Sequence, residues 1–136
     1  MNNQTLRDMA LTYFTGVDTQ DIEMIFQTLS DDCVFKVETH GVDLVGRAAI
    51  TGVFERLWAH HEWVSHDQFH FVGDENGSDI AARFQVTNKM HDGALVHKSN
   101  CNFFTAKDVI AEMWYFLTSI LTYITQNSVA ILRNLK

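Results

Sequence analysis

The 136-residue sequence contains no proline and only two cysteines, Cys33 and Cys101. Without proline, the chain lacks the residue that often marks linkers, and its length suits a single core. Both cysteines lie in strand-like segments and form no Cys-x-x-Cys pair. We therefore expect one domain with buried thiols rather than a disulfide.

Long apolar runs and an excess of basic residues are also lacking. No apolar stretch approaches the length of a membrane span and no leader follows Met1, which predicts a cytoplasmic protein without a membrane partner. The formal charge is −7, from 10 Lys and Arg against 17 Asp and Glu. This charge repels phosphate backbones, and no basic stripe offsets it, so we expect no nucleic-acid partner.

The sequence is rich in apolar residues, which make up 46% of the chain, and their spacing predicts three helices. The first helix carries a stripe that includes Tyr13 and Phe14. The second carries Ile22, Ile25, Phe26 and Leu29, with Asp18 or Thr19 as its cap and Asp31-Asp32 at its end. The third has apolar residues at helical intervals over 50–58.

Strand signals surround and follow the third helix. Residues 33–37 have the β-branched and aromatic content of a strand, and residues 39–43 are loop-like. From residue 63 the period approaches two, which predicts strands over 64–72, 80–88, 95–104 and 109–117, joined as an antiparallel meander. The apolar residues of 118–136 fit helical and strand spacing equally well. We expect this extension to pack on the same domain or on a partner subunit.

Three stretches occur in an order and at intervals typical of one superfamily: LSDDCVF at 29–35, LVGRAAI at 44–50 and DVIAEMW at 108–114. With them, the chain resembles the nuclear-transport-factor-2-like superfamily, in its branch of SnoaL-like and ketosteroid-isomerase-like proteins. The resemblance implies an α+β domain over 1–117: a cone-shaped α+β barrel with three N-terminal helices packed on a curved, mainly antiparallel sheet. It also implies a homodimer formed through the outer sheet face.

The catalytic positions of these relatives match only in part. Ketosteroid isomerases have a tyrosine on the first helix, where this chain has Tyr13. Val37 stands at the position of their base, Asn100 at that of their protonated acid, and Tyr115 at that of the acid in SnoaL-type cyclases. A valine cannot transfer a proton, so neither mechanism applies unchanged. The Asn100 amide can still donate a hydrogen bond to an oxyanion.

A cluster of histidines supplies a second candidate base. The segment from His61 to His66 resembles the His-x-x-x-Asn-His segment of some dehydratase-like relatives, with Ser65 in place of Asn. The resemblance implies that His66 or His61 acts as a general base, for which imidazole is suited near neutral pH. Other interpretations stay open: these histidines are solvated, Tyr13 is a buried core residue with a satisfied hydroxyl, and Asn100 faces a dimer interface. No carboxylate completes a metal-ligand set, so we expect no metal site.

These considerations predict Tyr13, His66 and Asn100 as catalytic residues of a mostly hydrophobic cavity. The other predicted lining residues are Phe35, Val37, Phe54, Trp58, Phe84, Val86, Asn88, Asn102, Met113 and Tyr115. We expect the cavity to bind a small, largely apolar, oxygenated molecule, with no cofactor. Two functions stay open: an isomerase, cyclase or dehydratase, and a non-catalytic dimerisation or protein-interaction module that uses Trp114 and Phe116.

Overall fold

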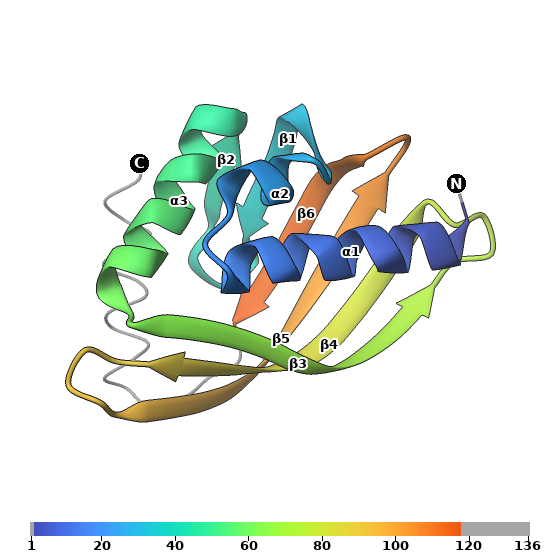
Figure 1. The fold of residues 1–136 in the computed structure, drawn as a ribbon. Helices are drawn as coiled ribbons and strands as arrows, with labels where there is room; N and C mark the ends of the chain where they lie inside the picture. The colour runs from blue at the N-terminus through green and yellow to red at the C-terminus, as the bar shows by residue number, and fades with distance from the viewer. Residues whose placement is uncertain (1, 118–136) are drawn as a thin grey trace.

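Three helices cover one face of a curved six-stranded sheet in the computed structural model, which describes residues 2–117 (Figure 1). The elements follow the order α1 (Asn3–Asp18), α2 (Ile22–Phe26), β1 (Leu29–Val37), a 3-10 turn (Glu38–His40), β2 (Val42–Val45), α3 (Arg47–His60), β3 (Trp63–Gly73), β4 (Asp79–Lys89), β5 (Leu95–Ala106) and β6 (Ile110–Leu117). The predicted packing of 118–136 lies outside the described residues. Within the described part, no helix is long and apolar enough to cross a membrane.

The strand order is β2-β1-β6-β5-β4-β3. β1 and β6 run parallel, and all other neighbouring strands run antiparallel. The predicted meander of four strands after the third helix is therefore confirmed, as is a mixed α+β fold with a mainly antiparallel sheet. In Figure 1, α1 crosses the sheet and α3 stands at one end of it, so both helices face the same side.

The side chains of the sheet alternate between this helix-covered inner face and an outer face. On β5, the even-numbered residues from Val96 to Ala106 point inward, and most of them are buried. β3 changes its alternation at a bulge between Asp67 and His70, where Gln68 has φ 54°. Because a bulge adds an unpaired residue, His66 before it and Phe69 after it both point inward.

The core forms where the apolar stripe of α1 meets the inner face. Phe14 lies at its centre, with ring centroids 4.6 Å from Phe84 and 5.0 Å from Phe69. α2 packs closely against α1 at Gly16, where an added Cβ would lie 2.8 Å from Cγ1 of Ile25. Only glycine allows this approach, which holds α2 close against the end of α1.

Two predictions about the first half of the chain were wrong. The second helix ends at Phe26, and Leu29, Asp31 and Asp32 belong to β1. The aspartates are tolerated in a strand because β1 is irregular between Leu29 and Val34, where both carboxylates are exposed. The predicted loop over 39–43 contains the start of β2, a short edge strand whose weak pattern is difficult to recognise.

Candidate functional site

A cavity of about 90 Å³ lies between α1, α3 and the inner face of the sheet. At roughly 15 Å³ for each enclosed water, it has space for several waters or a small ligand. Its apolar walls are formed by Phe14, Val17, Phe35, Val37, Val53, Phe54 and Leu57. Its polar groups come from Tyr13, His61, His66, Lys98, Asn102 and Tyr115. Such a lining, mainly apolar with a few polar groups, is typical of small-molecule sites.

Asp18 and His66 form a hydrogen-bonded pair at this cavity. Nδ1 of His66 donates to Oδ1 of Asp18 at 2.5 Å, and the backbone N–H of His66 donates to Oδ2 at 2.8 Å. The His66 side chain is 8% exposed and that of Asp18 is 23% exposed. Because an ionised carboxylate only accepts, Nδ1 of His66 carries a proton in this pair, and in the neutral ring it is the Nε2 lone pair that can act as a base.

The position of Asp18 follows from how the two first helices meet. The cap of α2 is Asp21, whose side chain accepts from the Met24 N–H at 3.0 Å, so the predicted cap at Asp18 or Thr19 was wrong. Asp18 is the last residue of α1, where the helix dipole disfavours a negative charge. Its carboxylate instead reaches β3, which binds the end of α1 to the strand that carries His66.

Tyr13 and Tyr115 bring two phenols to the cavity. Burial raises the pKa of Tyr13 well above its usual value, and Tyr115, Cys33 and Asp18 add to this shift. Burial also raises the pKa of Tyr115. Both hydroxyls therefore stay protonated at neutral pH and can donate hydrogen bonds. Within residues 2–117, no side chain or backbone group accepts a hydrogen bond from Tyr13, which lines the cavity.

Asn100 lies behind the cavity wall and is hydrogen-bonded to Tyr115, which lines the cavity. Its amide Nδ2 donates to Oη of Tyr115 at 2.5 Å, and the residue is 0% exposed. Asn100 therefore points to the inner face and does not lie at the outer sheet face. Because the Tyr115 oxygen accepts this bond, its own proton is directed elsewhere and can be donated to another acceptor.

Asn102 presents an unsatisfied acceptor at the cavity. Its Nδ2 makes a long contact of 3.7 Å to Sδ of Met113, and its Oδ1 has no hydrogen-bond partner among the described residues. The residue is 1% exposed. A buried amide oxygen is costly to leave unpaired, so a water or a ligand donor is expected beside it.

His61 and Lys98 add two nitrogens whose pKa values are lowered. Burial lowers the pKa of His61, partly offset by its Nδ1–H bond to the Leu57 carbonyl at 2.8 Å, so its ring is neutral at pH 7. Lys98 keeps some exposed surface, yet the protein around its ammonium lowers its pKa from 10.5 to about 8. Across residues 2–117, no three His, Cys, Asp or Glu side chains are placed to hold a metal ion.

The structure brings together about half of the predicted site residues. Those on the cavity wall are Tyr13, Phe35, Val37, Phe54, His66, Asn102 and Tyr115. Those that pack behind the described wall are Trp58, Phe84, Val86, Asn88, Asn100 and Met113. Trp58 donates its indole N–H to the Val17 carbonyl at 3.0 Å and stacks on Phe54, so it supports the wall.

Two polar residues of the site were not predicted. Asp18 was interpreted as a helix cap, although an acid at the negative end of a helix indicates another partner. Lys98 lies two residues before Asn100 on the same strand face, so the period of two that joins Asn100, Asn102 and Phe104 already includes it.

Comparisons with known proteins agree with this fold. The family model of the SnoaL-like domain matches residues 10–113. No curated protein matches the sequence. Among solved structures, a candidate polyketide cyclase from Xanthomonas campestris pv. campestris is 16% identical with a TM-score of 0.81, covering 97% of this chain and 99% of that one. PrhC from Penicillium brasilianum is 16% identical with a TM-score of 0.79, covering 98% and 93%.

A third solved structure, TerC co-crystallised with polyporic acid, is 14% identical with a TM-score of 0.74 and covers 90% of this chain and 96% of that one. At these identities the similarity shows the fold alone.

Proposed function

Because this chain belongs to the SnoaL-like domain family, with its nuclear-transport-factor-2-like fold, we propose that it binds a small, largely apolar, oxygenated molecule in its cavity. We further propose that it catalyses a proton transfer on this molecule, as an isomerase, cyclase or dehydratase. In this proposal the helices close one side of a cone around the ligand. The observation that carries the proposal is the Asp18–His66 pair at the wall of an otherwise apolar cavity.

His66 is the general base of this reaction. Its Nε2 takes a proton from the ligand, from a carbon next to a carbonyl or from a hydroxyl, and the ring becomes an imidazolium. Asp18 stabilises that cation through the Nδ1–H bond at 2.5 Å and holds the ring in one orientation. The same imidazolium then returns the proton to another atom of the ligand, which completes an isomerisation, a ring closure or a loss of water.

Two phenols stabilise the oxygen that gains negative charge in this step. Tyr13 and Tyr115 are both protonated donors at the cavity, and hydrogen bonds aimed at a developing oxyanion in a dry site lower the barrier. Asn100 is a positioning residue in this scheme, because its amide donates to Tyr115 and orients that hydroxyl. Val37, at the base position of ketosteroid isomerases, supplies apolar wall and no proton transfer.

The remaining predicted ligand-binding residues take two roles. Phe35, Phe54 and Asn102 contact the ligand directly from the cavity wall. A second set, buried or partly buried behind the wall, sets its shape: Trp58, Phe84, Val86, Asn88 and Met113. We expect substitutions in this second set to change stability more than selectivity, because their side chains fill core volume.

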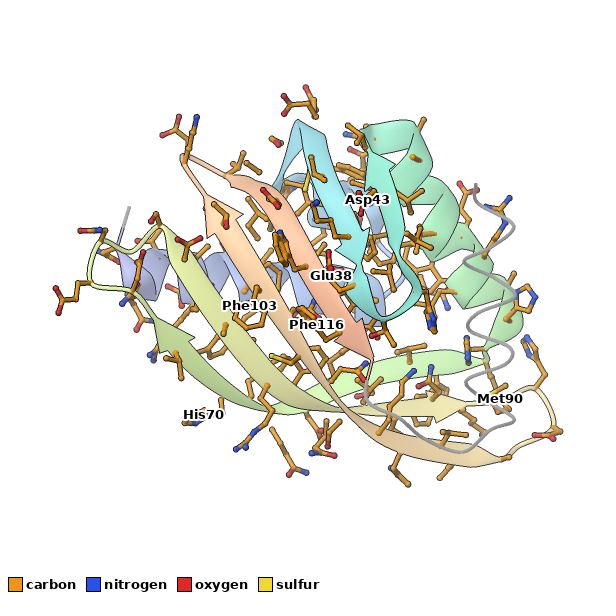
Figure 2. The ribbon with its side chains drawn as sticks, turned by 180° about the vertical axis from the view of Figure 1, so that it is seen from behind. Glu38, Asp43, His70, Met90, Phe103 and Phe116 are labelled. Atoms are coloured by element: carbon orange, nitrogen blue, oxygen red, sulfur yellow. The ribbon has the colours of Figure 1, made fainter. Side chains whose placement is uncertain are left out.

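A deuterium-exchange assay tests the proposed base. Incubated in D₂O, the protein is expected to accelerate exchange of the acidic C–H of small aryl ketones, measured by NMR. His66→Gln should lower the protein-catalysed rate by about 10²-fold or more. His70→Gln is the matched control, since His70 lies after the bulge and points away from the core on the outer side (Figure 2). An equal effect of both substitutions, or no effect of His66→Gln, would contradict the assignment.

A non-catalytic dimerisation module is the second candidate, and the outer sheet face favours it. Figure 2 shows Phe103 and Phe116 on this face, where their ring centroids lie 5.7 Å apart. Phe103 is 47% exposed and the neighbouring Trp114 is 39% exposed. An apolar patch of this kind is typical of a protein interface. A protein that dimerises through this face but neither binds nor exchanges any aryl ketone would support this alternative.

A further inference from the structure

Lys98 has no role in the proton transfer described above, yet it is the only cationic side chain in the described lining of the cavity. It points inward from β5, in line with Val96, Asn100 and Asn102. The strand register places it opposite Val86, which in turn pairs with His66 on β3. His66 and Lys98 therefore share one row across the sheet, about 10 Å apart at Cα for a spacing of two strands.

Among the described residues, no carboxylate is paired with this ammonium. Within residues 2–117, the salt bridges join other pairs, and Lys98 makes no hydrogen bond. The described cavity wall contains no Asp or Glu, and the nearby Asp18 is already bonded to His66. Residues 118–136 contain no Asp or Glu either, so no side chain from that segment can supply the missing charge.

A cation in such surroundings raises the free energy of the unliganded protein. Removing an ammonium from water without a counter-charge is costly, and the protein must compensate for it elsewhere. The cost disappears when an anion enters the cavity, because the two charges then attract each other in a region of low dielectric constant. Groups that destabilise the free protein and are satisfied by a ligand are typical of functional sites.

We propose that the ligand is an anion, a small ring system whose carboxylate or ionised phenol or enol binds the Lys98 ammonium. This inference rests on the proposed function, since it concerns the same cavity. The row across the sheet orients the ligand, with its charged oxygen at Lys98 and the carbon that exchanges its proton at His66. The free Oδ1 of Asn102 then accepts from a hydroxyl of the ligand. The substrate class is accordingly a hydroxylated aromatic or unsaturated acid.

Binding of three ring probes to the full chain, measured by titration calorimetry, tests this assignment. Benzoate carries a carboxylate, 4-nitrophenolate carries an ionised phenol, and benzamide is the neutral analogue of benzoate. We expect the wild type to bind at least one anion about tenfold or more tightly than benzamide. Lys98→Met should weaken binding of the preferred anion and so remove this preference, whereas Lys98→Arg should keep it.

Lys107→Met is the matched control, because Lys107 is an exposed lysine in the turn after β5. Equal affinity of the wild type for benzamide and both anions would overturn the charge assignment while leaving the proposed cavity binding intact. A preference that survives Lys98→Met would overturn it too. Failure of all three probes to bind would contradict the anion and the proposed function together. A urea melt of each variant shows that the compared proteins are folded.

Discussion

Replacing Lys98 by methionine should stabilise the unliganded protein, and the gain should depend on pH. Methionine fills a similar volume without a charge, so the substitution removes the cost of the buried ammonium. Burial lowers the pKa of Lys98 from 10.5 to about 8 in the folded state. At neutral pH the lysine is charged in both the folded and the unfolded chain, and the full cost is present.

The size and sign of the effect follow from proton linkage. A fall from 10.5 to about 8 corresponds to about 3 kcal/mol at 1.36 kcal/mol per pKa unit. Between these two values the unfolded chain binds more protons than the folded one, so the wild type gains stability as pH rises. The advantage of Lys98→Met is therefore largest below pH 8, at about 3 kcal/mol, and shrinks toward zero near pH 10.5.

Urea unfolding of the wild type and the variant, followed by tryptophan fluorescence from neutral pH to about pH 10, measures this difference. The comparison is made at each pH because Cys33, Tyr13 and Tyr115 have raised pKa values and lower the stability of both proteins at high pH. Taking the difference cancels their contribution. A stability difference that does not change with pH, or a destabilised variant, would refute the assignment of Lys98 as a partly buried cation without a counter-charge.

Three further predictions concern the dyad, the wall and the outer face. Asp18→Asn turns a charge-assisted hydrogen bond into a neutral one. It should lower the rate of C–H exchange by about tenfold or more and the free energy of unfolding by about 1–2 kcal/mol. An unchanged rate in the NMR assay would argue against the Asp18–His66 dyad. Trp58→Phe keeps the stacking but removes the indole bond to the end of α1, so a urea melt should show a loss of about 1 kcal/mol. Phe103→Ser combined with Trp114→Ser should turn a homodimer into a monomer in sedimentation velocity, and a monomeric wild type at micromolar concentration would count against the dimer.

Most of the fold was predictable because it depends on patterns that are local in the sequence. The helical stripe of α1 and the period of two in β4 and β5 each require only a short window, and both were identified correctly. The bulge in β3 was not predictable, since Gln68 carries no glycine-like signal for its φ of 54°. Its consequence is large, because a shift of one residue decides which side chains of β3 face the core.

Some features of the candidate site also follow from local sequence patterns, whereas others depend on contacts between distant residues. The aromatic wall and the inward orientation of Asn102 follow from alternation along single strands, so local patterns were sufficient to predict a mostly apolar interior with a few polar groups. The partnership of Asp18 with His66 joins residues 48 positions apart. It requires α1 to pack across the inner face of the sheet beside β3, and no local pattern encodes a distance of that kind.

Lys98 depends on both the local pattern and the tertiary structure. Its position on the inner face follows from the period of two in the sequence, but the absence of a counter-charge beside its ammonium among the described residues does not. A lysine on a strand is ordinarily solvated, and only the tertiary structure decides whether a carboxylate stands beside it. Here the described lining contains none, because the acids of the chain lie elsewhere or are already bonded. Periodicity determines which way a side chain points, whereas the energy of its charge depends on neighbours brought together by folding.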